Sequence, residues 1–433
     1  MASSPLTAAL AGLTTRGRAF AAAGAAAVVC SVFLGQRDLL RVGVLLLALP
    51  LASVLLVARA RHRIQLSRTI TPARVTAGRP ASVRLELTNL SRLPTGVLLA
   101  EDHVPYVLGS RPRFVVDRLD GGAHADVGYS VRSDVRGRWE IGPLGLRLTD
   151  PFGMCEVTRS FSATDPLVVV PRVHPLVPLR ASGSWMGSGE SVPRSAAAAG
   201  EHDLATREYR HGDDLRRVHW RSTARRGELM VRRDEQPHQM RATLLLDRRA
   251  VGHRGDGPAS SFEWAVSAAA SISSLLVDSG YGVRILSDDV ETSWTGREHS
   301  TGTGQLLDQL ATVPAGGPHD LRHASGLLAR AGGDGLVVAL LGEVDVPDVH
   351  AFAALTRRGV TGVAVLLVTT TWAMLPPRRA SGIDAARQRV VAVLDQAGWS
   401  VVQVRASDTV PDSWTRLVSH HHAHRGTRAG MAR

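Results

Sequence analysis

Two long apolar runs close to the N-terminus constrain the fold more than any other feature of this sequence. Residues 19–34 (AFAAAGAAAVVCSVFL) and 42–58 (VGVLLLALPLASVLLVA) contain no charged side chain. Each run is near the short end of what a helix needs to cross a bilayer. Only the segment GQRDLLR separates them, so the sequence predicts an antiparallel hairpin of two transmembrane helices, at about 19–35 and 39–58, within an N-terminal segment 1–63.

A secretory signal peptide is the alternative for the first run, because Arg16 and Arg18 precede it. A signal peptide would be followed by a small-residue cleavage site and a polar mature sequence. Here a second apolar run follows instead, which favours the hairpin.

The arginines around the two runs predict the orientation of the hairpin. They lie before the first run and after the second, at Arg16, Arg18, Arg59, Arg61, Arg63 and Arg68. The connecting segment has Arg37 and Arg41, which Asp38 offsets in part. Since positive charge stays on the cytoplasmic side, we expect a multi-pass protein of the cell membrane, in contact with the lipid bilayer, whose soluble domains face the cytoplasm.

The basic composition does not by itself predict a nucleic-acid partner. The net charge is +12, and all 51 basic residues are arginine, which indicates a general bias rather than a patch placed by function. Anionic lipid remains a suitable counter-surface. The two cysteines, Cys30 and Cys155, have no paired spacing, so neither a disulfide framework nor a cysteine metal site is expected.

Residues 64–175 are expected to form an all-β sandwich of the immunoglobulin-like kind. Short alternating segments at 82–89, 124–133, 144–150 and 166–173 are separated by turn signals, a pattern typical of sandwiches. In the turn Asp150-Pro151-Phe152-Gly153, the proline presets a type I turn, the aspartate accepts a backbone N–H and the glycine frees the exit. A small, polar and aperiodic stretch at 176–203 is predicted to be a linker.

Residues 241–408 are expected to form a doubly wound α/β domain. Apolar segments at 242–247, 282–287, 335–342, 361–370 and 400–406 have the character of strands covered on both faces, and segments with helical spacing lie between them. The tail 409–433, which is rich in histidine and arginine, is expected to be disordered. The cluster His420 to His424 can bind a transition metal opportunistically.

The segment 204–240 between these regions contains an unusual density of charge. Nine arginines and six acids lie in 207–235, which leaves a surplus of about three positive charges (nine minus six). Asp213 or Asp214 is expected to cap a helix that starts near Leu215 and stops at Gly227, and an edge strand is expected next. Because much of the charge is compensated locally and few aromatic residues accompany it, we do not expect a nucleic-acid groove.

This segment carries a resemblance to a known family. The pattern RxYxxGDxxRxxxWxxxAR, followed by Leu229 and Val231, is similar to the signature of the domain-of-unknown-function 58 family. Its positions here are Arg207, Tyr209, Gly212, Asp213, Arg216, Trp220, Ala224 and Arg225. The segment RGRWEIGP (136–143) with DPFG (150–153) and the hairpin resemble the family's layout as well, so the resemblance extends from residue 18 to about 405.

The resemblance implies a membrane-anchored protein whose C-terminal domain has a von Willebrand factor type A-like fold. It implies as partners a MoxR-type AAA+ ATPase and a transglutaminase-like membrane protein. Family members generally have no assigned activity. We expect the signature to act as an interdomain clamp, in which arginines pair with carboxylates of a neighbouring domain, so that function resides in the resulting surface as a partner site.

Type A domains bind a divalent cation through a DxSxS motif after their first strand. At this position the chain has Asp247 but neither serine, and Arg248 and Arg249 follow it. One carboxylate beside two arginines is a poor cation site, so no metal and no cofactor are expected. Asp247 could still converge with Glu343 or Asp288 at the strand ends, or it could simply cap the following loop.

Enzyme motifs are not found in a suitable context. His211, His219 and Asp213 could form an acid/base pair, although such residues more often hydrogen-bond a turn. Two hypotheses therefore remain. The first is a membrane-tethered, non-enzymatic interaction module that works with the ATPase in the assembly or maturation of other proteins. The alternative is a hydrolase or metal-dependent enzyme that uses the His and Asp residues of 202–219.

Overall fold

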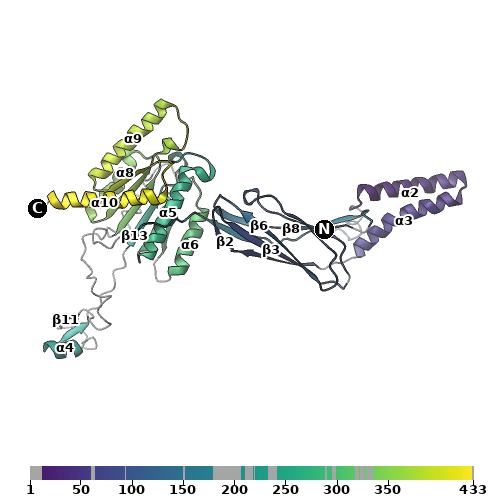
Figure 1. Cartoon of the computed structure of the whole chain (residues 1–433), viewed down its shortest axis with the longest axis horizontal. Coiled ribbons are helices and arrows are strands. Elements are labelled where there is room, and N and C mark those ends of the chain that lie inside the picture. Colours follow the sequence, from purple (N-terminus) through teal and green to yellow (C-terminus); the bar gives the residue numbers. More distant parts are fainter. Residues whose placement is uncertain are drawn as a thin grey trace. The chain divides into compact units, whose positions relative to one another are not determined.

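The computed structural model describes most of the chain as two compact units, which divide after Pro171 (Figure 1). The described residues are 12–59, 64–92, 94–149, 152–178, 206–209, 218, 220–232, 241–287, 290–294, 299–316, 321, 326, 328 and 335–431. Of the residues expected to carry the site, Asp150, Pro151, Gly212, Asp213 and Arg216 lie outside these ranges.

The N-terminal unit begins with two helices, α2 (Thr15–Leu34) and α3 (Arg37–Arg59). Both are long and apolar enough to cross a membrane, by length and composition. They approach closely at glycines. A Cβ atom on Gly24 would lie 2.9 Å from the backbone nitrogen of Leu47, and one on Gly43 would lie 2.9 Å from that of Val28. The expected helical hairpin is therefore present, and small residues allow its two backbones to approach.

The rest of this unit is a β-domain with one core. The strands are β1 (Ile64–Thr71), β2 (Arg74–Thr76), β3 (Pro80–Asn89), β4 (Leu98–Asp102), β5 (Arg113–Val116), β6 (His124–Arg132), β7 (Gly137–Ile141), β8 (Leu144–Thr149), β9 (Glu156–Ser160) and β10 (Asp165–Val170). They form the sheets β1-β3-β6, β2-β10-β7 and β5-β4-β8-β9. Alternate residues of β3 and of β8 enter the same core, which is the inward–outward alternation that a sandwich requires. The four expected segments correspond to β3, β6, β8 and β10.

A buried arginine joins strands of all three sheets. The side chain of Arg68 on β1 is 1% exposed. Its Nη2 donates to Asp102 of β4 at 2.8 Å, and its Nη1 donates to Asp165 of β10 at 2.9 Å. The Tyr129 hydroxyl of β6 also donates to Asp102, at 2.6 Å. Removing one partner from this cluster would leave a buried charge uncompensated, which is strongly destabilising.

The C-terminal unit contains a six-stranded sheet in the order β15-β14-β13-β16-β17-β18. The strands are β13 (Arg241–Leu246), β14 (Gly282–Ser287), β15 (Val290–Trp294), β16 (Leu336–Leu341), β17 (Thr361–Leu367) and β18 (Ser400–Val404). All neighbouring pairs are parallel except β14 with β15. The five expected strands are confirmed, and the antiparallel edge strand β15 is an addition to the expected set.

Helices cover both faces of this sheet. The core on one face includes side chains of α5 (Ser261–Asp278), α6 (His299–Thr312) and α10 (Val410–Met431). The core on the other face includes side chains of α8 (Val346–Ala353) and α9 (Pro377–Gln396) (Figure 1). The doubly wound α/β arrangement is therefore correct for the described part of this unit.

Two expected boundaries are wrong. The tail after residue 408 is not disordered but forms helix α10 as far as Met431, because Val410, Trp414 and Leu417 recur at helical spacing and are buried. The sandwich was expected to continue to residue 175. Instead, the backbone of His174 donates to Ser271 of α5, and the indole of Trp414 donates to the carbonyl of Val177, so this segment packs on the C-terminal unit.

Candidate functional site at the strand ends

Among the described strands of the C-terminal unit, the direction of the strand order reverses at β13. From β13 the chain continues to β14 on one side, and β16 later returns on the other side of β13. In open α/β sheets, ligands bind at such a switch point, beside the carboxyl ends of the strands. Asp247 directly follows β13 and Glu343 follows β16. These two carboxylates therefore mark the candidate site.

The carboxylate of Asp247 is completely buried and has four N–H donors. The guanidinium of Arg249 donates from Nε to Oδ1 and from Nη2 to Oδ2, both at 3.0 Å. The backbone N–H groups of Arg249 and Gly342 donate to the same carboxylate, at 3.1 and 3.2 Å. The bond from Arg249 N is the local loop cap that sequence reasoning kept open for Asp247.

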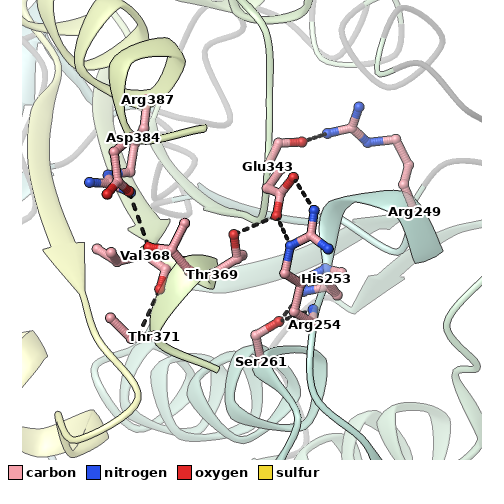
Figure 2. Close-up of polar contacts among 11 residues, drawn as sticks. Arg249, His253, Arg254, Ser261, Glu343, Val368, Thr369, Thr371, Asp384 and Arg387 are labelled. Atoms are coloured by element: carbon pink, nitrogen blue, oxygen red, sulfur yellow. Dashed lines mark hydrogen bonds and ion pairs between the residues drawn. The ribbon is translucent and has the colours of Figure 1, made fainter. Parts of the chain in front are cut away.

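Arg249 fills the space between the ends of β13 and β16. Its side chain is 4% exposed. Besides holding Asp247, its Nη1 donates to Asp348 at 3.0 Å. Its Nη2 donates to the carbonyl of Glu343 at 2.8 Å (Figure 2). Arg249 was expected to repel a cation. In the structure its guanidinium also occupies the position beside Asp247 that a cation would take, and it supplies the positive charge there. Arg248 differs, since its Nε donates to the carbonyl of Pro314 near the surface.

A second arginine–carboxylate pair lies at the end of β16. Arg254 binds the Glu343 carboxylate through Nε and through Nη2, the latter at 2.8 Å, and the Thr369 hydroxyl after β17 donates to the same carboxylate at 2.7 Å. Figure 2 shows Arg254 and Thr369 both directed at Glu343. The hydrogen bond to Glu343 raises the pKa of Arg254. Asp247 and Glu343 thus converge at the strand ends, each with its own arginine, whereas Asp288 lies outside the described residues.

His253 lies next to this network, and both of its ring nitrogens form hydrogen bonds. Its Nε2 is 2.8 Å from the carbonyl of Asp247, so Nε2 carries the proton, and Nδ1 accepts from the hydroxyl of Ser261 at 3.2 Å. The ring packs edge-on against Phe262 at 5.2 Å. Burial lowers the pKa of His253. A neutral imidazole in this position orients the loop and is not aimed at a substrate.

We call Asp247, Arg249, Arg254, Glu343 and Thr369 the strand-end cluster. Sequence reasoning singled out Asp247 and Glu343 but missed the role of Arg254 and Thr369. The available signal was the basic segment RRAVGHR after the strand at 242–247 and the pair GE after the strand at 335–342. Opposite charges that follow two neighbouring parallel strands meet at the carboxyl ends of those strands. Among the described residues, no group of three or more His, Cys, Asp or Glu side chains is arranged to hold a metal ion.

The family signature forms a short hairpin-and-helix element. Strand β11 (Thr206–Glu208), which contains Arg207, pairs with β12 (Met230–Arg232), and the N–H of Tyr209 donates to the carbonyl of Leu229 at 2.8 Å. Helix α4 (Trp220–Arg226) packs beside β12, where the Thr223 hydroxyl accepts from the N–H of Met230 at 3.0 Å.

The start of the helix in this element differs from the expected one, while the clamp role of the element stays a prediction. The helix begins at Trp220 rather than near Leu215, because Val218 pairs with Val231 in an isolated antiparallel bridge. Trp220 was expected to pack in a clamp, but it is 69% exposed. Ala224 and Arg225 are also exposed, whereas Gly227 ends the helix with φ 75°, as expected.

The signature residues do not meet the strand-end cluster through any contact that the structure describes. His211 and His219, which were considered as an acid/base pair with Asp213, lie outside the described residues. In the turn after β8, Gly153 has φ 68° and Phe152 is 52% exposed.

Two solved structures that are similar to this chain each cover about a quarter of it. A CARDB domain from Pyrococcus furiosus has 10% identity and a TM-score of 0.19, and covers 25% of this chain and 89% of its own length. A putative ApaA protein from Bordetella pertussis has 11% identity and a TM-score of 0.20, and covers 25% of this chain and 94% of its own. These scores are too low to carry an argument about fold or function.

No curated protein matches the sequence. A family model does match, over residues 205–397, which include the signature element, the strand-end cluster and most of the C-terminal sheet. That model is described as "Protein of unknown function DUF58", so residues 205–397 of this chain are a domain of that family.

Proposed function

We propose that the protein is a membrane-tethered interaction module whose C-terminal unit binds a partner protein through the strand-end face of its sheet. The observation that carries this proposal is that both carboxylates at the strand ends are already paired. At the switch point, where an enzyme of this architecture would place its substrate, the carboxylates of Asp247 and Glu343 are each paired with an arginine. Among the described residues, this end of the sheet therefore offers an outer surface rather than a lined pocket for a small ligand.

Two apolar side chains stand out on the loops around the cluster. Met374, on the loop after β17, is fully exposed, and Val251, on the turn after β13, is 56% exposed. Methionine is common at surfaces that accept other proteins, because its flexible thioether adapts to a partner. The paired arginines below make the surface rigid, which reduces the entropy lost on binding.

The fold of this unit supports a von Willebrand factor type A-like assignment as part of the proposal. The order β15-β14-β13-β16-β17-β18, with a single antiparallel edge strand, is the order that such an assignment requires. An immunoglobulin-like topology for the N-terminal sheets remains a prediction. The proposed partner is a MoxR-type AAA+ ATPase, with a transglutaminase-like membrane protein as a further component, and the role is the assembly or maturation of other proteins.

A binding measurement with a purified MoxR-type ATPase tests this proposal. The full-length protein in detergent is immobilised, and the ATPase is titrated with and without ATP. We expect saturable binding that Met374→Asp weakens at least tenfold. The matched control is Gln396→Asp. It places the same new charge at the exposed C-terminal end of α9, near the start of β18 and so at the amino ends of the parallel strands. Equal affinity of both variants would refute the strand-end face, and no binding by the parent would refute the ATPase as partner.

A further inference from the structure

The turn between β8 and β9 lies against the base of the helical hairpin. The N–H of Thr14 donates to the carbonyl of Met154 at 2.9 Å, and its hydroxyl donates to the carbonyl of Gly153 at 2.8 Å. The N–H of Glu156 donates to the carbonyl of Gly12 at 2.8 Å. The three residues before α2 thus extend the β8–β9 turn by pairing with it, so the first helix starts directly at this turn.

The second helix packs against the same turn. Cys155 is completely buried, and it forms a small apolar cluster with Val54 of α3, joined by Leu13 and Val157. A Cβ atom on Gly17 of α2 would lie 2.3 Å from the carbonyl of Met154. The turn therefore contacts both helices at one level of the hairpin.

The helix pairing identifies that level. Gly24 lies opposite Leu47, and Gly43 lies opposite Val28. Continuing this antiparallel register by seven residues along each helix places Gly17 opposite Val54, in agreement with their separate contacts to the turn. The helix α2 becomes uniformly apolar at Ala19, which at about 1.5 Å per residue is only about 6 Å beyond Thr15. The headgroup layer of a bilayer is about as thick as this distance.

The apolar surface of α3 continues beside the turn. Leu51 and Leu55, on either side of the level of Val54, are both exposed. If α3 crosses a membrane, the hydrocarbon edge has to reach this level to cover them, because exposed leucines are costly in water. On the other helix, Arg16 and Arg18 are exposed at nearly the same level, where guanidinium groups can bind lipid phosphates.

From this arrangement we infer that the β8–β9 turn is a lipid-contacting surface: Phe152 inserts at the boundary between headgroups and acyl chains, while Arg16 and Arg18 bind the phosphates around it. Phe152 is 52% exposed although it is a large aromatic side chain, and phenylalanine is among the apolar side chains that membrane-surface segments bury at the boundary between headgroups and acyl chains. The inference rests on the proposed membrane anchoring and deepens it. The β-domain would then be held against the bilayer through this turn, not only through the chain that links it to the hairpin.

Depth-dependent quenching tests the inference on the full-length protein in lipid vesicles. In a Cys30→Ser background, Phe152→Cys is labelled with bimane, and nitroxide lipids that carry the quencher at a shallow or a deep acyl position are added. The unsubstituted Cys30→Ser protein reports whether the buried Cys155 takes up label. The matched control is Tyr106→Cys. Tyr106 is also an exposed aromatic residue. It follows β4, whose last residue pairs with the first residue of β8. Tyr106 therefore lies near the start of β8, whereas the turn follows the end of β8.

We expect strong quenching at position 152, greater from the shallow than from the deep nitroxide, and little quenching at position 106. Equal and weak quenching at both positions, in protein that resists extraction by alkaline carbonate, would overturn the lipid contact while leaving the anchoring intact. Release of the protein by carbonate would overturn the anchoring itself, and the lipid contact with it.

Discussion

Arg249 holds the carboxylate of Asp247 through two parallel hydrogen bonds in a buried position between the ends of β13 and β16. Removing the guanidinium would leave Asp247 buried with backbone donors alone. An uncompensated buried charge of this kind typically costs about 3–5 kcal/mol. We therefore expect Arg249→Met to lower the free energy of unfolding by that amount.

The neighbouring arginine provides a matched control for this prediction. Arg248 donates to a backbone carbonyl near the surface, so we expect Arg248→Met to cost less than about 1 kcal/mol. Denaturant unfolding of the full-length protein in detergent, followed by tryptophan fluorescence, measures both variants. Equal losses for the two would show that the buried pair has no special role in stability.

The pH dependence of stability reports on His253. Burial lowers the pKa of His253 below 6.5. As the pH falls, the unfolded chain is therefore protonated at this residue before the folded chain is. Stability from this residue is therefore fully present above about pH 6.5 and is lost as the pH falls below it. In His253→Gln, whose amide can donate to the Asp247 carbonyl and accept from Ser261, we expect a smaller loss between pH 7.5 and 5.5.

His174 is the control for this pH measurement. Burial also lowers its pKa, and the charge of Arg172 adds to the effect, but its ring is only half-buried. We expect His174→Gln to remove a smaller part of the pH dependence than His253→Gln does. An unchanged profile in His253→Gln would mean that the neutral state of this ring contributes nothing to folding.

The hairpin makes a prediction that depends on backbone contact. A side chain at Gly24 would meet the backbone of Leu47 and of Gly43, which cannot move aside as a flexible side chain can. We expect Gly24→Leu to separate the two helices and destabilise the hairpin by about 1–3 kcal/mol. Ala22→Leu, on the exposed side of the same helix, should have little effect.

Disulfide crosslinking between the helices checks the hairpin prediction. Cysteines placed at Ala27 and Leu47, in a Cys30→Ser background, should crosslink readily in the parent and in Ala22→Leu, and much less in Gly24→Leu. Unchanged crosslinking in Gly24→Leu would show that the two helices do not depend on this close approach.

The main elements of both units were predictable from the sequence because hydrophobic periodicity is local. The runs around Leu85 and Leu146 alternate, and those around Val338 and Val365 are continuous, so the β-domain and the covered sheet could be distinguished. The helix in the C-terminal tail was harder to predict from the sequence. Its many histidines and arginines obscured the apolar positions of Trp414 and Leu417, which become meaningful only against a neighbouring core.

Local sequence patterns do not predict which arginines form buried pairs with carboxylates. With every basic residue an arginine, the sequence does not indicate which guanidinium groups are buried. The clamp was expected around Arg216, whereas the described structure has buried arginine–carboxylate pairs at Arg68 and Arg249. Burial depends on which strand ends become neighbours, and that is decided by sheet order rather than by any segment alone.

The signature element retains a testable prediction about the clamp. We expect Arg216→Ala and Asp213→Ala each to lower the thermal stability of the full-length protein, as an interdomain clamp requires. Trp220→Ala should now be close to neutral, because this side chain is 69% exposed. Differential scanning calorimetry distinguishes the outcomes. Wild-type stability in both Arg216→Ala and Asp213→Ala would eliminate the clamp and leave a binding or catalytic role for these residues.

The orientation of the hairpin is the last prediction, and the proposed partner depends on it. Arginines lie at both outer ends of the two apolar helices, at Arg16 and Arg18 before the first and Arg59 after the second, so both ends are expected in the cytoplasm. Alkaline phosphatase fused after Arg433 should therefore be inactive, because the enzyme needs the periplasm, while a fusion within the turn at Gln36 should be active. Activity of the C-terminal fusion alone would place the β-domain and the strand-end face outside the cytoplasm. A cytoplasmic ATPase could not then reach Met374, so this result would reject the proposed partner as well as the orientation.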